Sequence, residues 1–133
     1  MKIYTLEKDI TTLCEKAKEF PHDVKAAFER LIAKTGGFEG RTMFGISYLE
    51  NGKLVYIAAC SAKEPGEAEK LGTGEWTIPK GDYLTELIEN WQGKEHLFEA
   101  TFKKLGDSEY PTAMPGIEWY YGEDVKCMLP LTD

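Results

Sequence analysis

The residues best placed to do chemistry in this chain are a carboxylate and a phenol, Glu118 and Tyr120, two positions apart in a run of strand-forming residues. Side chains alternate along a strand, so Glu118 and Tyr120 are expected on one face and Ile117 and Trp119 on the other. We expect the helix-facing side to take Ile117 and Trp119. The opposite face then presents a carboxylate in aromatic surroundings, which is a place where a cation can bind.

A simpler interpretation of Glu118 stays open on the residues alone. Lone glutamates are mostly exposed and solvated. Lys126, on the strand that follows, could also pair with Glu118 across the hairpin, a contact worth about 0.2 to 1 kcal/mol. Neither alternative requires a binding site.

The composition excludes several classes of protein. A net charge of -7 repels a phosphate backbone, so direct binding of nucleic acid is not expected. No run approaches the roughly 20 apolar residues of a membrane span, and the N-terminus has no apolar signal core. We expect a single domain over residues 1–133 that lies in the cytoplasm and has no membrane partner.

Metal and cofactor chemistry is not expected either. Cys14, Cys60 and Cys127 are widely spaced in apolar or alternating segments, as is typical of reduced, buried thiols. His22 and His96 have no second ligand at useful spacing. A catalytic Cys–His pair is the less favoured alternative, because buried structural cysteines are far commoner than nucleophiles.

The first half of the chain predicts a strand, a helix and a hairpin. The strand covers about residues 10–18. An apolar stripe that includes Phe28 and Leu31 predicts a helix that closes at Gly36-Gly37. Residues 41–49 and 53–62 then form two strands joined at Asn51-Gly52, the strongest short hairpin signal. Residues 63–70 are expected to be a charged surface connection.

The second half repeats this order. An extended region runs from Trp76 to about Trp91, a helix ends at Gly106, and a last hairpin turns at Gly122-Glu123. Phe28 and Phe102 are 74 positions apart, and the same offset sets Phe44 against Glu118. We therefore predict an α+β fold of two β-α-β-β units, over about residues 10–62 and 74–131, that share an antiparallel sheet. Two helices would cover one face, and a ligand groove would follow the seam on the other.

Four short motifs, in order and at fitting spacings, resemble the GyrI-like effector-binding domain, which also forms the ligand-binding half of AraC-type and MerR-type multidrug regulators. They are Lys18-Glu19-Phe20-Pro21, the segment from Arg41 through Gly45-Ile46-Ser47, the segment 78–83, and Gly116-Ile117-Glu118-Trp119-Tyr120 with 126–131 after it. Together they span about residues 10–131.

The resemblance implies an aromatic pocket with a central glutamate that binds cationic, lipophilic small molecules. Glu118 matches that glutamate, and Tyr120 matches the aromatic residue two positions later. Tyr56, Trp76, Phe44 and Tyr83 are our choices for the pocket walls, since they lie in matching strands and their facing follows from alternation.

The sequence contains no helix-turn-helix pattern, so we expect a stand-alone binder or sensor, which would act on transcription through a protein partner or by sequestering its ligand. Two alternatives remain. Some stand-alone relatives are hydrolases that open cyclopropane rings of DNA-alkylating natural products. Glu118 would then be a general base and Tyr120 a proton donor, with a second carboxylate from Glu86, Glu75 or Glu50. The third function is an interaction with DNA gyrase.

Overall fold

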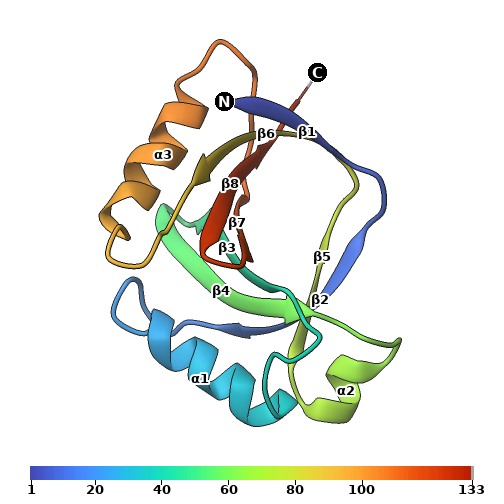
Figure 1. The fold of residues 1–133 in the computed structure, drawn as a ribbon. Helices are drawn as coiled ribbons and strands as arrows, with labels where there is room; N and C mark the ends of the chain where they lie inside the picture. Colours follow the sequence, from blue (N-terminus) through green and yellow to red (C-terminus); the bar gives the residue numbers. More distant parts are fainter. Residues whose placement is uncertain (133) are drawn as a thin grey trace.

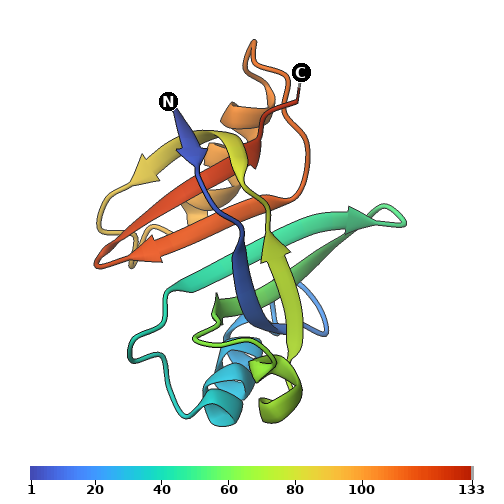
Figure 2. The same ribbon diagram turned by 90° about the vertical axis from the view of Figure 1, so that its right-hand side faces the viewer.

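The computed structural model, which describes residues 1–132, contains eight strands in one antiparallel sheet that curls into a half-barrel (Figures 1 and 2). The strands are β1 (Lys2–Leu6), β2 (Ile10–Lys16), β3 (Met43–Glu50), β4 (Lys53–Ser61), β5 (Gly74–Ile78), β6 (Gly81–Ile88), β7 (Gly116–Tyr121) and β8 (Asp124–Pro130). The predicted α+β class and antiparallel sheet are confirmed.

The order of the strands is symmetric about the middle of the sheet. It runs β1-β6-β8-β7-β3-β4-β2-β5, so that each half presents its strands in the same sequence outward from the central β3–β7 pair. The first strand of each half crosses over, because β1 pairs with β6 and β5 pairs with β2. The extended region predicted from Trp76 to about Trp91 is thus two strands that pair with different partners, with a break at Pro79-Lys80.

Two helices lie against the outer face of the curled sheet (Figure 1). The first, α1 (Val24–Thr35), packs on β2 and β4, and α3 (His96–Gly106) packs on β6 and β8. Each buries a leucine completely, Leu31 in α1 and Leu105 in α3. The left-handed Gly36 ends α1, and its N–H donates to the Ile32 carbonyl.

A third, short helix, α2 (Glu67–Leu71), forms within the segment predicted as a surface connection. Glu67 is buried and accepts two hydrogen bonds from the guanidinium of Arg41, at 2.9 and 2.5 Å. It also accepts the Lys63 N–H at 2.7 Å. The charged stretch is ordered because this buried pair attaches α2 to the start of β3. None of the helices within residues 1–132 is long and apolar enough to cross a membrane.

The curl of the sheet encloses an inner core to which every strand contributes. Its buried members are Leu6, Cys14, Phe44, Ile46, Ile57, Ala59, Ile78, Tyr83, Ile117 and Met128. Separate clusters fill the space between the outer face and the helices. Ile117 and Trp119 belong to the inner core, whereas Tyr120 packs beneath α3. The expectation that Ile117 and Trp119 face the helices is therefore wrong, because closing the curl requires an apolar inner face.

Candidate functional site

Glu118 lies at the centre of the sheet, on the outer face, opposite a glycine. In the β3–β7 ladder Glu118 pairs with Gly45, and Ser47 pairs with Gly116. A Cβ atom at Gly45 would overlap with the Tyr56 hydroxyl and with Oε1 of Glu118. The missing side chain at Gly45 thus makes the space in which the carboxylate lies, and Glu118 is only 7% exposed.

Two tyrosines hold one oxygen of this carboxylate. Tyr56 Oη, from β4, donates to Oε1 of Glu118 at 2.8 Å, and Tyr120 Oη, on the same strand as Glu118, donates to Oε1 at 2.5 Å. Within residues 1–132 no donor reaches Oε2. The carboxylate is therefore oriented through one oxygen, and the other is available to a ligand.

The environment of Glu118 disfavours its charge in the absence of a partner. Burial raises the pKa of Glu118, while the hydrogen bonds from Tyr120 and Tyr56 act in the opposite sense by stabilising the anion. Burial, followed by the adjacent carboxylate, also raises the pKa of both phenols. The two tyrosines therefore remain protonated and act as donors.

Lys126 does not neutralise Glu118, so the simple cross-hairpin pair is not formed. It lies opposite Trp119, and Glu118 is opposite Cys127. The Lys126 ammonium is 3.8 Å from the ring centroid of Tyr4, on the inner side of the sheet. The ladder register thus places the lysine and the glutamate on opposite faces.

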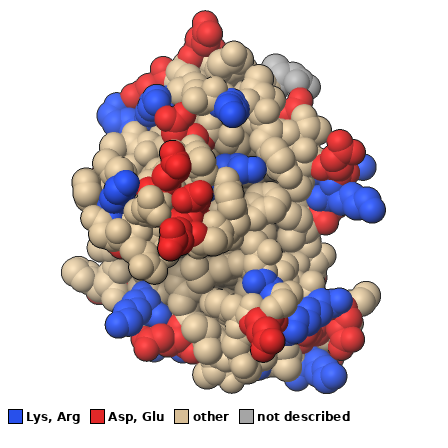
Figure 3. All heavy atoms as spheres, in the orientation of Figure 1, with Lys and Arg blue, Asp and Glu red and all other residues tan. Residues whose placement is uncertain are grey.

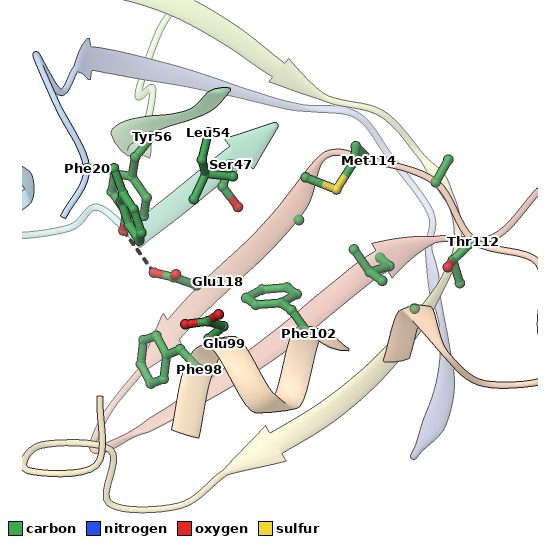
Figure 4. A pocket seen from close by; sticks show the side chains of 14 residues that line it. Phe20, Ser47, Leu54, Tyr56, Phe98, Glu99, Phe102, Thr112, Met114 and Glu118 are labelled. Atoms are coloured by element: carbon green, nitrogen blue, oxygen red, sulfur yellow. Dashed lines mark hydrogen bonds between the residues drawn. The ribbon is translucent and has the colours of Figure 1, made fainter. Parts of the chain in front are cut away.

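A cavity of about 600 Å³ opens above Glu118 (Figure 4). Figure 4 shows Phe20 and Tyr56 on one side of Glu118, and Phe98 and Phe102 on the other. None of the fourteen lining residues is a lysine, arginine or histidine. They are Phe20, Ser47, Leu54, Tyr56, Phe98, Glu99, Phe102, Gly106, Thr112, Ala113, Met114, Gly116, Glu118 and Leu129. The cavity is therefore aromatic and acidic.

The walls of the cavity come from the two halves of the chain. Phe20 precedes α1 and Leu54 lies on β4, whereas α3 and the loop before β7 form the other wall. One side of the mouth is apolar, since Phe20, Met114 and Leu54 are 45%, 44% and 39% exposed. Figure 3, in the orientation of Figure 1, shows mostly uncharged surface between the two halves, with acidic side chains bordering it above. The groove follows the predicted seam but lies on the helix side of the sheet, because the inner face is filled by core side chains.

Three of the six residues predicted to bind a ligand meet at this site, namely Glu118, Tyr120 and Tyr56. Phe44 and Tyr83 lie instead in the inner core. Trp76 packs against the same core and stacks on Tyr48 with 5.4 Å between ring centroids. Phe44 pairs with Trp119 in the ladder, so its side chain projects to the face opposite Glu118. The sequence analysis assigned these three residues to strands, but it did not identify the face of the sheet to which their side chains project.

The acids considered as a second catalytic carboxylate lie elsewhere. Glu86 pairs with the N-terminal ammonium at 2.6 Å and with Lys104 at 2.8 Å. Glu50 lies 4.0 Å from Lys16 at the end of the hairpin, and Glu75 lines a separate surface depression. The second carboxylate at the cavity is Glu99, on α3.

Several residues of the site escaped the sequence analysis. Phe98 and Phe102 have the helical spacing of an apolar stripe. The sequence pattern does not distinguish a stripe that packs on a sheet from one that lines a cavity. Phe20 lies within a motif of the family resemblance, and its ring stacks on Tyr56 with 5.7 Å between centroids. Only pairing across the sheet reveals that Gly45 makes space for Glu118.

Comparison with solved structures shows that other proteins share this fold. The chain is similar to SAV2435, which was solved bound to tetraphenylphosphonium, with 14% identity, a TM-score of 0.71, and 98% of this chain and 93% of that chain covered. It is similar to the integron cassette protein VCH_CASS2 of Vibrio cholerae, with 14% identity, a TM-score of 0.69, and 98% and 95% covered. It also resembles a hydrolase from Listeria innocua, with 9% identity, a TM-score of 0.62, and 98% and 90% covered.

A scan against protein-family models gives no match, and no curated protein sequence matches the chain significantly. The structural likeness, at 14% identity or below, therefore establishes a common fold and nothing finer.

Proposed function

We propose that the protein binds lipophilic organic cations in the cavity above Glu118. The observation that carries the proposal is a buried carboxylate with one oxygen held by two tyrosines and the other without a donor, at the floor of an aromatic cavity. The resemblance of the sequence motifs to GyrI-like domains points to the same use of Glu118.

The energetics of the buried carboxylate favour a cationic ligand. A buried carboxylate without a counter-ion is unfavourable by several kcal/mol, and a bound cation removes much of this penalty. Each aromatic face adds on the order of 0.5 to 2 kcal/mol of cation–π attraction. An anion would meet two carboxylates, Glu118 and Glu99, and no basic side chain among the lining residues.

The shape of the cavity suits a bulky, partly aromatic ligand. Its volume of about 600 Å³ falls within the usual range for drug-sized molecules, roughly 300 to 1,000 Å³. The exposed rings and chains of Phe20, Leu54 and Met114 at the mouth can cover the apolar part of a ligand. SAV2435, which shares the fold, was solved with the bulky aromatic cation tetraphenylphosphonium.

Titration with tetraphenylphosphonium tests the proposal. Binding should be saturable in the wild type by calorimetry and should weaken at least about tenfold, or ~1.4 kcal/mol, in Glu118→Gln. Glu7→Gln removes the same charge from an exposed position between β1 and β2 and should leave binding within about twofold. Binding that is absent, or equal in wild type and Glu118→Gln, would refute the assignment.

A hydrolytic activity is the second candidate, supported by the fold shared with the Listeria innocua hydrolase. Oε2 of Glu118 could accept a proton from water as the water oxygen attacks a strained cyclopropane carbon. The ring bond breaks, and its electron pair moves onto the conjugated carbonyl, which is then protonated. Mass spectrometry of a cyclopropane-bearing alkylating compound should show the addition of one water, and Glu118→Gln should abolish it. An unchanged substrate would exclude this reaction.

A further inference from the structure

Glu99 gives the cavity a second acidic group with properties different from those of Glu118. It lies on α3 between Phe98 and Phe102, and all three side chains line the cavity (Figure 4). Unlike Glu118, Glu99 is exposed, so it belongs to the rim and not to the floor.

The charge of Glu99 is not neutralised by the chain. Within residues 1–132 no ammonium or guanidinium forms an ion pair with it, whereas Glu86, which faces the same helix from β6, is paired with Lys104. Glu99 lies in the first turn of α3, where the helix dipole stabilises an anion. The helix dipole acts on the Glu99 carboxylate whichever way the side chain points. In this structure the side chain points into the aromatic cavity.

We propose that Glu99 is a specificity residue that makes the cavity prefer ligands with two separated positive charges over ligands with one. This inference rests on the proposed function. One cationic group would lie at the floor against Glu118, the aromatic body would lie between Phe20, Phe98 and Phe102, and the second cationic group would lie at the mouth against Glu99. The neutral rim residues Leu54 and Met114 offer no competing charge.

Because Glu99 is exposed, its effect should be modest and sensitive to salt. Exposed ion pairs contribute little, because water and salt screen the two charges. Their attraction is screened over about 10 Å at 0.1 M salt and about 3 Å at 1 M. The second charge should therefore increase affinity severalfold at low ionic strength and much less at high ionic strength.

Ethidium and propidium provide the matched probes, since both contain the same phenanthridinium ring system and propidium adds one quaternary ammonium on a short chain. We expect the wild type to bind propidium about threefold more tightly than ethidium at 20 mM salt, or ~0.7 kcal/mol, by fluorescence titration. Glu99→Gln should weaken propidium binding about threefold more than ethidium binding and so remove this preference, whereas Glu99→Asp should keep part of it.

The protein's net charge of -7 also attracts a dication more strongly, so Glu7→Gln is titrated in parallel. A propidium preference that survives in Glu99→Gln, or that falls equally in Glu7→Gln, would overturn the role of Glu99. Ethidium binding that does not depend on Glu118 would instead overturn the proposed function. The ethidium titration therefore distinguishes a failure of the role of Glu99 from a failure of the proposed function.

Discussion

Replacing Glu118 by glutamine should stabilise the free protein while weakening its binding of cations. The amide keeps the shape of the side chain, and its oxygen can still accept hydrogen bonds from Tyr56 and Tyr120. These bonds become weaker, because bonds to a charged acceptor are roughly twice as strong as bonds to a neutral one. The penalty for burying the charge disappears as well. Burial outweighs the hydrogen bonds in wild type, since the pKa of Glu118 is raised.

The sign of the pH dependence follows from that raised pKa. A carboxyl group with a higher pKa in the folded state than its ordinary value of 4.5 favours folding in its protonated form. This contribution is complete below about pH 4.5 and is lost as the pH rises through the folded-state pKa. Each unit of upward shift corresponds to about 1.4 kcal/mol. We therefore expect Glu118→Gln to be more stable than the wild type at pH 8, and to differ little from it at pH 4.5.

Thermal unfolding at pH 4.5 and pH 8 checks this expectation, with Glu7→Gln as the control for a lost surface charge. Each kcal/mol gained corresponds to a rise of about 3 to 5 °C in Tm for a chain of this size. Tetraphenylphosphonium at 100 times its Kd should stabilise wild type by about 2.7 kcal/mol and the variant far less, so the ligand should close or reverse the difference in Tm. If Glu118→Gln instead lowers Tm equally at both pH values, the carboxylate is a structural acceptor and the reasoning is refuted.

Three further predictions concern the residues that support the site. Gly45→Ala should lower stability by about 1 to 3 kcal/mol through overlap with Oε1 of Glu118. Gly106→Ala should not, because a Cβ there makes only an ordinary van der Waals contact with Leu129, at 3.9 Å. Equal chemical-denaturation midpoints for the two variants would contradict this. Tyr120→Phe removes a hydrogen bond that lowers the pKa of Glu118, so tetraphenylphosphonium binding should require a higher pH; an unchanged pH profile would exclude that role. Arg41→Ala should destabilise the fold by about 3 kcal/mol because it leaves buried Glu67 unpaired. The pKa of Glu67 is lowered from 4.5 to about 2, chiefly by Arg41 and also by the Lys63 N–H. The wild-type stability from this pair is therefore lost as the pH falls through that window, and the variant should show a smaller loss in acid denaturation.

Local sequence signals predicted most of the elements. The apolar stripe and Gly36 identified α1, and Asn51-Gly52 identified the turn between β3 and β4. The crossing of β1 and β5 to the opposite halves was not predicted, because pairing between distant strands leaves no local signature. The short helix α2 was also missed, since its charged sequence resembles a solvated loop until the buried partner of Glu67 is known.

The candidate site was predicted only in part, because alternation groups side chains by face without saying which face is inside. Glu118 and Tyr120 were correctly placed together. Phe44 was aligned with Glu118 by an offset of 74 positions, yet the two residues lie on opposite faces. The register of the β3–β7 pair supports a different alignment of the two halves, with an offset of 71. Gly45 then corresponds to Gly116 (116 − 45 = 71), and Ser47 corresponds to Glu118 (118 − 47 = 71).

This equivalence explains why the duplicated sheet carries a single central carboxylate. Ser47 and Glu118 each lie opposite a glycine, on the same outer face and on neighbouring strands. Diagonal neighbours of this kind are about 7 to 8 Å apart, so a second buried carboxylate at Ser47 would raise the pKa of the first further and leave both protonated more of the time. With a carboxylate only at Glu118 and a hydroxyl at Ser47, the carboxylate at the floor of the cavity ionises more readily. A second negative charge is tolerated only where water screens it, which is where Glu99 lies, at the exposed rim of the same cavity.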